Sequence, residues 1–163
     1  MVGLDLGKRR VGVAVSDSGG VMAVPSTTLH RTGDDVRDRR RLAEVVRELE
    51  PERVVVGLPR SLDGSDGPAA VWARGEAAAL VELLDVPVEL YDERLTTVSA
   101  QRSLVAAGVK GRDRRRVVDQ VAAAVLLQAW LDGGRGLDRG RGRGLDGGLG
   151  EGLDGGRGTG TGG

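Results

Sequence analysis

The chain has 163 residues, enough for one domain with a buried core, and it contains no cysteine and a single histidine, His30. This composition excludes disulfides and a cysteine nucleophile and argues against a histidine-based zinc site, whereas the plentiful carboxylates suit Mg²⁺ or Mn²⁺. Basic and acidic residues balance at 24 each, which argues against binding of polyanions through net charge, and with no membrane span or signal peptide pattern we expect a cytoplasmic protein.

The N-terminal residues predict a hairpin of two short strands, 2–6 and 11–16, joined through 8–10. Strand alternation places Asp5 on one face together with glycines, and the second strand also has a face of small residues. The hairpin would therefore put Asp5 on a floor of small residues that a metal ion and a phosphodiester could approach. The alternative is that this small face receives a packed helix and that Asp5 is a turn residue.

The next residues predict a third strand over 21–29, and Pro25 within it favours an edge position or a bulge. A helix is predicted over 34–50, because Asp34 and Asp35 can cap its start and Pro51 follows its end. Its apolar positions are Val36, Leu42, Val45, Val46 and Leu49. Its arginines, which we interpret as a solvated face, are Arg37, Arg39, Arg40 and Arg41.

Residues 53–56 form a short apolar run that is typical of a buried strand, and a loop rich in turn residues follows at 57–67. In open α/β sheets, ligands usually bind at this carboxyl end of the strands. A helix is predicted over 69–84, with core candidates Val71, Ala78, Val81 and Leu84. A strand over 86–91 then leads to Asp92, Glu93 and Arg94, and a third helix is predicted over 97–107.

The last predicted helix spans 114–131 and begins in a basic cluster at 110–116, a placement that makes more sense if a polyanion lies nearby. From Asp119, the positions at helical spacing are apolar, so Asp119 begins a stripe that should face the interior. A carboxylate there is costly unless it binds a metal or pairs with an arginine, and both alternatives stay open.

The composition changes at Gly133, because 16 of the 28 glycines fall in 133–163, interleaved with arginines. No core can form from such a segment. We therefore expect a folded domain over 1–132 and a disordered Gly/Arg-rich tail over 133–163.

The predicted order of three strands, helix, strand, helix, strand and two helices, with an acid on the first strand, is typical of an α/β ribonuclease-H-like fold with a mixed central sheet flanked by helices. Four motifs in this order also resemble those of the YqgF (RuvX-like) family over residues 2–132. They are residues 3–17, residues 56–64, residues 92–97, and Val118-Asp119 with Ala122-Ala123.

The resemblance implies a metal-dependent nuclease that matures pre-16S ribosomal RNA and is related in fold to Holliday-junction resolvases. It implies an acidic site of Asp5, Glu93 and Asp119, with Asp92 as a fourth candidate, because strand alternation alone does not decide between Asp92 and Glu93. Two Mg²⁺ or Mn²⁺ ions roughly 4 Å apart could then activate water and stabilise the leaving oxygen. We expect phosphates to be bound by Lys8, Arg9, Arg60, Arg94, Lys110, Arg112 and Arg116.

Three alternatives remain at this point: a junction resolvase acting on DNA, a nucleotide-binding domain of the actin and sugar-kinase type, and a non-catalytic RNA-binding factor in ribosome maturation. The expected partners are precursor ribosomal RNA, branched DNA and the small ribosomal subunit, with no membrane partner. The scarcity of aromatic residues argues against recognition by base stacking. The sequence leaves open whether the active unit is a monomer or a homodimer.

Overall fold

The computed structural model describes residues 1–96 and 114–141, with side chains described for 1–96 and 117–133. Five strands form one sheet in the order β3-β2-β1-β4-β5. They are β1 (Val2–Leu6), β2 (Arg10–Ser16), β3 (Ala23–His30), β4 (Val54–Leu58) and β5 (Val88–Asp92). β1, β2 and β3 pair antiparallel, whereas β1, β4 and β5 pair parallel, which confirms the expected mixed sheet.

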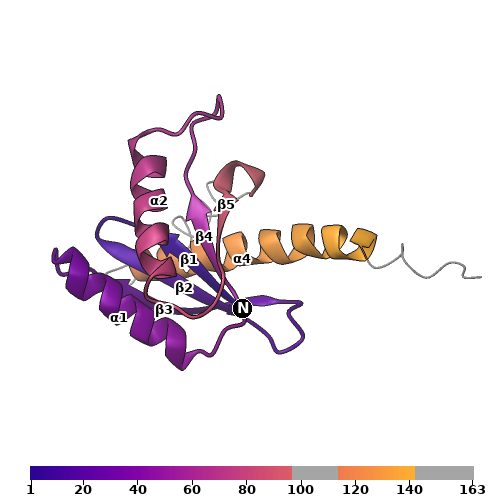
Figure 1. Cartoon of the computed structure of the whole chain (residues 1–163), viewed down its shortest axis with the longest axis horizontal. Coiled ribbons are helices and arrows are strands. Elements are labelled where there is room, and N and C mark those ends of the chain that lie inside the picture. The colour runs from indigo at the N-terminus through magenta and orange to yellow at the C-terminus, as the bar shows by residue number, and fades with distance from the viewer. Residues whose placement is uncertain (97–113, 142–163) are drawn as a thin grey trace, which may run out of the picture.

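Helices cover both faces of this sheet. They are α1 (Asp35–Glu48), α2 (Pro68–Val81), the short 3-10 helix η1 (Glu93–Leu95) and α4 (Arg114–Arg141). α1 and α2 lie on one side of the sheet and α4 crosses the other side (Figure 1). The helix predicted over 97–107 lies outside the described residues.

The first hairpin forms as predicted, since Val2 and Leu4 of β1 pack with Val11 and Val13 of β2 in the core beneath α1 and α2. β3 is an edge strand, and the β2–β3 register shifts beside Pro25, as the proline predicts. Alternation then turns the glycines of both strands toward α4.

The helix α1 begins as predicted, because the Asp34 side chain accepts a hydrogen bond from the Arg37 backbone amide. Of the core candidates predicted for this segment, Leu84 is buried, but Ala78 is exposed and Val71 and Val81 are more than half exposed, so the phase of α2 was predicted wrongly. The buried face of α2 consists of alanines, Leu80 and Glu76. Alanines lie on several sides of α2, so its apolar pattern does not indicate which side is buried.

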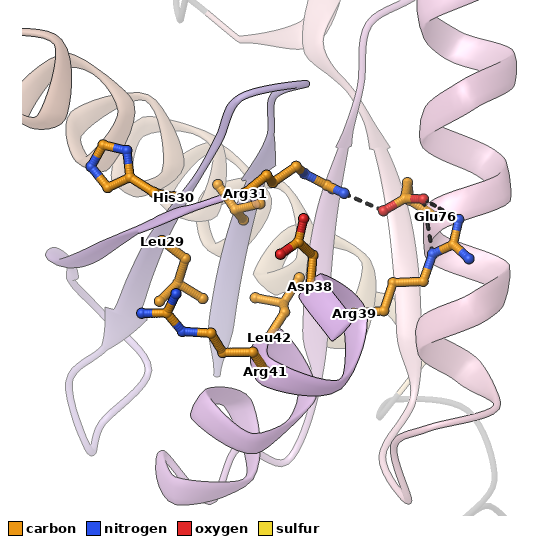
Figure 2. Close-up of a pocket in the computed structure, with 9 residues that line it drawn as sticks. Leu29, His30, Arg31, Asp38, Arg39, Arg41, Leu42 and Glu76 are labelled. Atoms are coloured by element: carbon orange, nitrogen blue, oxygen red, sulfur yellow. Dashed lines mark hydrogen bonds and ion pairs between the residues drawn. The ribbon is translucent and has the colours of Figure 1, made fainter. Parts of the chain in front are cut away.

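Glu76 joins α2 to α1 and to the end of β3, although its side chain is only 2% exposed (Figure 2). It accepts hydrogen bonds from Arg31 Nη2 at 2.8 Å and from Arg39 Nη2 at 2.6 Å. The Arg31 guanidinium also lies 5.0 Å from the centre of the Trp72 ring. Two guanidinium groups therefore balance one buried carboxylate where three elements meet.

α4 continues to Arg141 instead of ending at Leu131, so the domain boundary expected at 132 falls inside a helix. Glycines such as Gly133 weaken a helix by about 1 kcal/mol each but do not break it, and no proline interrupts this stretch. Residues 142–163 lie outside the described range. Within the described parts of the chain, no helix is long and apolar enough to cross a membrane.

Asp38 in α1 gives the fold a pH-dependent contact. Its buried carboxylate accepts hydrogen bonds from the Thr32 amide and hydroxyl and from the Gly33 amide, which hold the pKa of Asp38 below its ordinary value. A lowered pKa stabilises the fold above the unfolded-state value of about 3.9, and this contribution is lost as the pH falls through the folded-state pKa.

We therefore expect Asp38→Asn to lower the urea midpoint at pH 7, with the difference from wild type shrinking below about pH 4. The control is Asp35→Asn on the same helix, where an exposed carboxylate lies 4.0 Å from Arg39 and contributes little. A difference between Asp38→Asn and wild type that is constant with pH would contradict the prediction.

Candidate active site

Asp5 lies near the end of β1, in the centre of the sheet, and is only 8% exposed. Its partner across the β1–β2 ladder is Gly12. On the other side, Leu4 pairs with Val56 of β4, so the next position of that strand, Gly57, lies beside Asp5. The acid is thus flanked by a glycine on each neighbouring strand.

The glycine-lined face holds the helix α4. A Cβ atom at Gly3 would lie 2.7 Å from Leu127 Cβ, and one at Gly12 would lie 2.0 Å from the carbonyl oxygen of Asp119. A packed helix therefore covers the small face at these two glycines, as the alternative predicted, but Asp5 lies within β1 and is not a turn residue. The close approach brings the α4 backbone at Asp119 over Gly12, the ladder partner of Asp5.

Glu93 approaches Asp5 from the other side of β1. It follows β5 directly, in η1, and a Cβ atom at Gly57 would lie 2.5 Å from its carboxylate oxygen Oε1. Leu126 of α4 covers the same glycine at 3.3 Å. The missing side chain of Gly57 thus makes room for the Glu93 carboxylate next to Asp5.

The Asp119 carboxylate pairs with Arg10 at the start of β2, with 2.5 Å between Asp119 Oδ2 and Arg10 Nε. The ion pair that the sequence left as an alternative is therefore present. Among the described residues, no three acidic or histidine side chains lie close enough together to ligate one metal ion as they stand. Asp5, Glu93 and Asp119 nevertheless reach the same face of the sheet from three different elements.

Asp92 has different partners from its neighbour Glu93. It accepts hydrogen bonds from Arg94 Nη2 at 2.6 Å and from the Arg94 backbone amide, and Arg60 lies 3.7 Å away. The hydrogen bond from the Arg94 side chain holds the pKa of Asp92 below its usual range. Asp92 is thus engaged by two cations, whereas Glu93 lies over Gly57 beside Asp5.

The predicted phosphate-binding residues differ in their surroundings. Arg60 also pairs with Asp66, and Arg94 lies against the loop after β4, 3.5 Å from the Leu62 carbonyl oxygen. Lys8 and Arg9 are exposed in the β1–β2 turn. Lys110 and Arg112 lie outside the described residues, and the Arg116 side chain is not described.

A sequence profile described as "RuvX: Holliday junction resolvase" matches residues 1–133. The chain belongs to the RuvX family. This confirms the resemblance on which the acidic site was predicted, although the roles of Asp5, Glu93 and Asp119 in this RuvX chain remain predictions.

Relatives of this RuvX chain carry the name "Putative pre-16S rRNA nuclease". The protein of that name from Mycobacterium sp. (strain KMS) is 53% identical over 135 residues, 82% of this chain and 80% of that protein. The one from Anaeromyxobacter dehalogenans (strain 2CP-C) is 50% identical over 131 residues, 80% of this chain and 95% of that protein. "T. thermophilus RuvC in complex with Holliday junction substrate" is similar with a TM-score of 0.54 and 19% identity over 83% of this chain and 94% of that one, which confirms the fold.

Arg10 is the site residue that sequence analysis of this RuvX protein missed, because it was assigned to the turn. It opens β2 and is two residues before Gly12, so strand alternation places both on the face that α4 covers. Alternation along β2 could therefore have indicated that Arg10 points toward the last helix and its carboxylate.

Gly12→Ala should destabilise this RuvX chain by about 1–3 kcal/mol, because the new methyl group collides with the α4 backbone at Asp119. The matched control is Gly75→Ala in α2, where nothing lies within 4 Å and alanine should add up to about 1 kcal/mol of stability. Urea unfolding measures both changes. Equal stability of the two variants would show that α4 does not pack on Gly12 as described.

Proposed function

We propose that this chain is a metal-dependent endonuclease that hydrolyses phosphodiester bonds, acting in the cytoplasm on the 5′ end of pre-16S ribosomal RNA. The observation that carries the proposal is the placement of Asp5 between two glycines, with the α4 backbone at Asp119 over Gly12 and the Glu93 carboxylate over Gly57. The shared family and the names of the relatives support the reaction and the RNA substrate. We assign this activity to the domain ending near residue 132.

The donor set fits a hard divalent cation, because the proposed ligands are all carboxylates. Asp5 and Glu93 would hold the metal directly, and Asp119 would join them when it exchanges Arg10 for the ion. Asp92 would stay with Arg94 and Arg60. When bound, Mg²⁺ or Mn²⁺ supplies an activated water and stabilises negative charge on the leaving oxygen.

The other residues of the site would position the acids and the substrate. Arg10 orients the Asp119 carboxylate when no metal is bound. When Asp119 binds the metal, the Arg10 guanidinium would be a free positive charge at the edge of the site. The Arg60–Asp66 pair lies within the loop after β4 and Arg60 also pairs with Asp92 at the end of β5, so these contacts hold the loop that would border the substrate. Lys8 and Arg9 would contact flanking phosphates, without reading the bases.

A four-way DNA junction is the second candidate substrate. The profile description names a Holliday junction resolvase, and the similar RuvC structure holds such a junction. The same acids would perform the same hydrolysis, so the two proposals differ only in the nucleic acid bound. A resolvase would also need two active sites on one junction, and so a homodimer; a monomer would suffice for cleavage of a single RNA strand.

The test is cleavage of a precursor 16S RNA and of a four-way DNA junction, with Mg²⁺ or Mn²⁺, by wild type and Asp119→Asn. RNA cleavage that is lost in Asp119→Asn supports the proposal, and cleavage of the junction alone supports the resolvase. The control is Asp132→Asn on the same helix, where the carboxylate is exposed and accepts from Gln128. No cleavage of either substrate by wild type, or equal cleavage by both aspartate variants, would overturn the assignment.

A further inference from the structure

We propose that a second nucleic-acid contact surface lies on α1 and the β1–β2 turn, apart from the acidic site. We call it the α1 basic surface, and it consists of Lys8, Arg9, Arg37, Arg40 and Arg41. This inference rests on the proposed function, because the surface would bind the part of the nucleic acid that lies beyond the cleaved bond. The phosphate backbone is the part that it would bind.

Ion pairing separates these cations from the others. Where the structure describes side chains, each of the other arginines is engaged by a protein oxygen, and Arg47 binds the Leu83 carbonyl oxygen. The ones that pair with carboxylates are Arg10, Arg31, Arg39, Arg53, Arg60, Arg74 and Arg94. Within that same part of the chain, no ion pair or side-chain hydrogen bond involves the α1 basic surface, so none of its charges has a direct carboxylate partner.

The members of the surface are continuous in space. The Arg31 amide donates to the Arg9 carbonyl oxygen at 2.9 Å, so the β1–β2 turn lies against the end of β3. His30 and Arg41 border the same small pocket beside that end (Figure 2). Figure 2 also shows Arg31 and Arg39 turned toward Glu76, whereas Arg41 points away from it.

On α1 itself, Arg37, Arg40 and Arg41 border a shallow open hollow together with two acids, Asp34 and Glu44. The spacing of these arginines along the helix sets like charges three and four residues apart, which repel each other. Arg37 also lies in the first turn of α1, where the helix dipole disfavours cations. Bound phosphates would relieve both effects, which a merely solvated face would leave uncompensated.

The surface begins at the border of the acidic site. Lys8 lies in the β1–β2 turn, three residues after Asp5, and Arg10 at the start of β2 holds Asp119. From there the surface passes the end of β3 to α1, on the side of the sheet opposite α4. A nucleic-acid strand that leaves the acids across the β1–β2 turn would therefore meet Arg41, Arg37 and Arg40. Since the formal net charge is zero, such a local cluster decides where a polyanion binds.

The test measures binding of a fluorescently labelled fragment of precursor 16S RNA by anisotropy in EDTA, across a range of salt concentrations. The triple variant Arg37→Gln, Arg40→Gln and Arg41→Gln should bind roughly tenfold more weakly at low salt, and the slope of log K against log salt should fall by about 2. A second triple variant with lysine at the same positions should restore most of the affinity, because it keeps the charges.

The control variant lowers the net charge by the same three units as the glutamine variant, but on α2 instead of α1. Val71→Glu, Ala78→Glu and Val81→Glu add three acids to the exposed side of α2, so this variant should bind RNA almost as wild type. Circular dichroism checks that every variant is folded. Equal binding by the glutamine variant and wild type would overturn the inference, as would equal weakening in the α2 variant, which would indicate net charge alone.

Cleavage is measured separately with Mg²⁺, so the two proposals can fail independently. If wild type cleaves RNA and the glutamine variant binds RNA as wild type does, the nuclease assignment stands and the second surface is overturned. If the glutamine variant binds RNA more weakly but wild type does not cleave RNA, the α1 basic surface stands and the nuclease assignment is overturned. Loss of binding to an acidic ribosomal protein while RNA binding is unchanged would also count against the inference.

Discussion

Glu93→Gln should reduce metal-dependent cleavage roughly 10²–10³-fold, whereas Asp92→Asn should retain most of the activity. The two acids are adjacent in sequence, but only Glu93 places its carboxylate over Gly57 beside Asp5. Asp92 is held by Arg94 and Arg60, so its substitution removes an ion pair at the loop and not a proposed metal ligand. The comparison therefore tests the assignment that strand alternation could not make.

The measurement is the initial rate of RNA cleavage at saturating Mg²⁺, with Mn²⁺ in parallel. Titration of metal by calorimetry gives a second readout, in which Glu93→Gln should bind more weakly and Asp92→Asn should bind as wild type. The reverse pattern, with Asp92→Asn inactive and Glu93→Gln active, would assign the metal to Asp92 and make Glu93 a structural residue.

Glu76→Gln should cost about 3–5 kcal/mol of folding free energy, the largest stability effect that we expect from one substitution. The amide keeps the size of the side chain but removes the charge that balances Arg31 and Arg39, and the Arg31 side chain is only 7% exposed. The guanidinium groups would then remain partly buried without a counter-charge. The resulting cost follows from the missing partner and does not measure the net contribution of the ion pairs to wild-type stability.

Urea unfolding at pH 7 checks this value, with Glu82→Gln as the matched control near the exposed end of α2, where a change within about 0.5 kcal/mol is expected. Combining Glu76→Leu with Arg31→Met and Arg39→Met should recover much of the loss, because well-packed apolar groups can replace a buried ion cluster. A loss below 1 kcal/mol in Glu76→Gln would show that solvent reaches the arginines.

Much of the fold follows from strong local patterns. The alternation of glycine and valine in the first hairpin, the proline in β3 and the apolar run of β4 each allow few alternatives, and all four strands form close to where they are expected. The placement of Asp5 and Glu93 at the ends of β1 and β5 follows from the strand order, because the ends of parallel strands meet at one edge of the sheet. The grouping of Asp119 with them was implied by the family resemblance alone. Whether they bind metal there remains a prediction.

The sequence predicted less where alanine and glycine dominate. In α2 the small side chains do not mark which face is buried, so Val71 was predicted as a core residue and the burial of Glu76 was not predicted. In α4 the glycines after Asp132 suggested an end that the helix does not have. Arg10 and Asp119 are far apart in sequence, and the chain contains many arginines that could pair with Asp119. Arg10 is the partner because α4 packs on Gly12, and the sequence does not show that packing.

The packing of α4 links folding to ligand binding. The helix closes one of the hydrophobic cores through Ala123, Leu127 and Leu131, and its first described turns carry Asp119. A ligand that needs Asp119 in place can bind only molecules in which that core is closed, so its binding free energy adds to their stability. At a hundred times its dissociation constant the added stability is about 2.7 kcal/mol. Thermal protection by metal or RNA thus reports the affinity of that ligand for the form in which α4 is packed on the sheet.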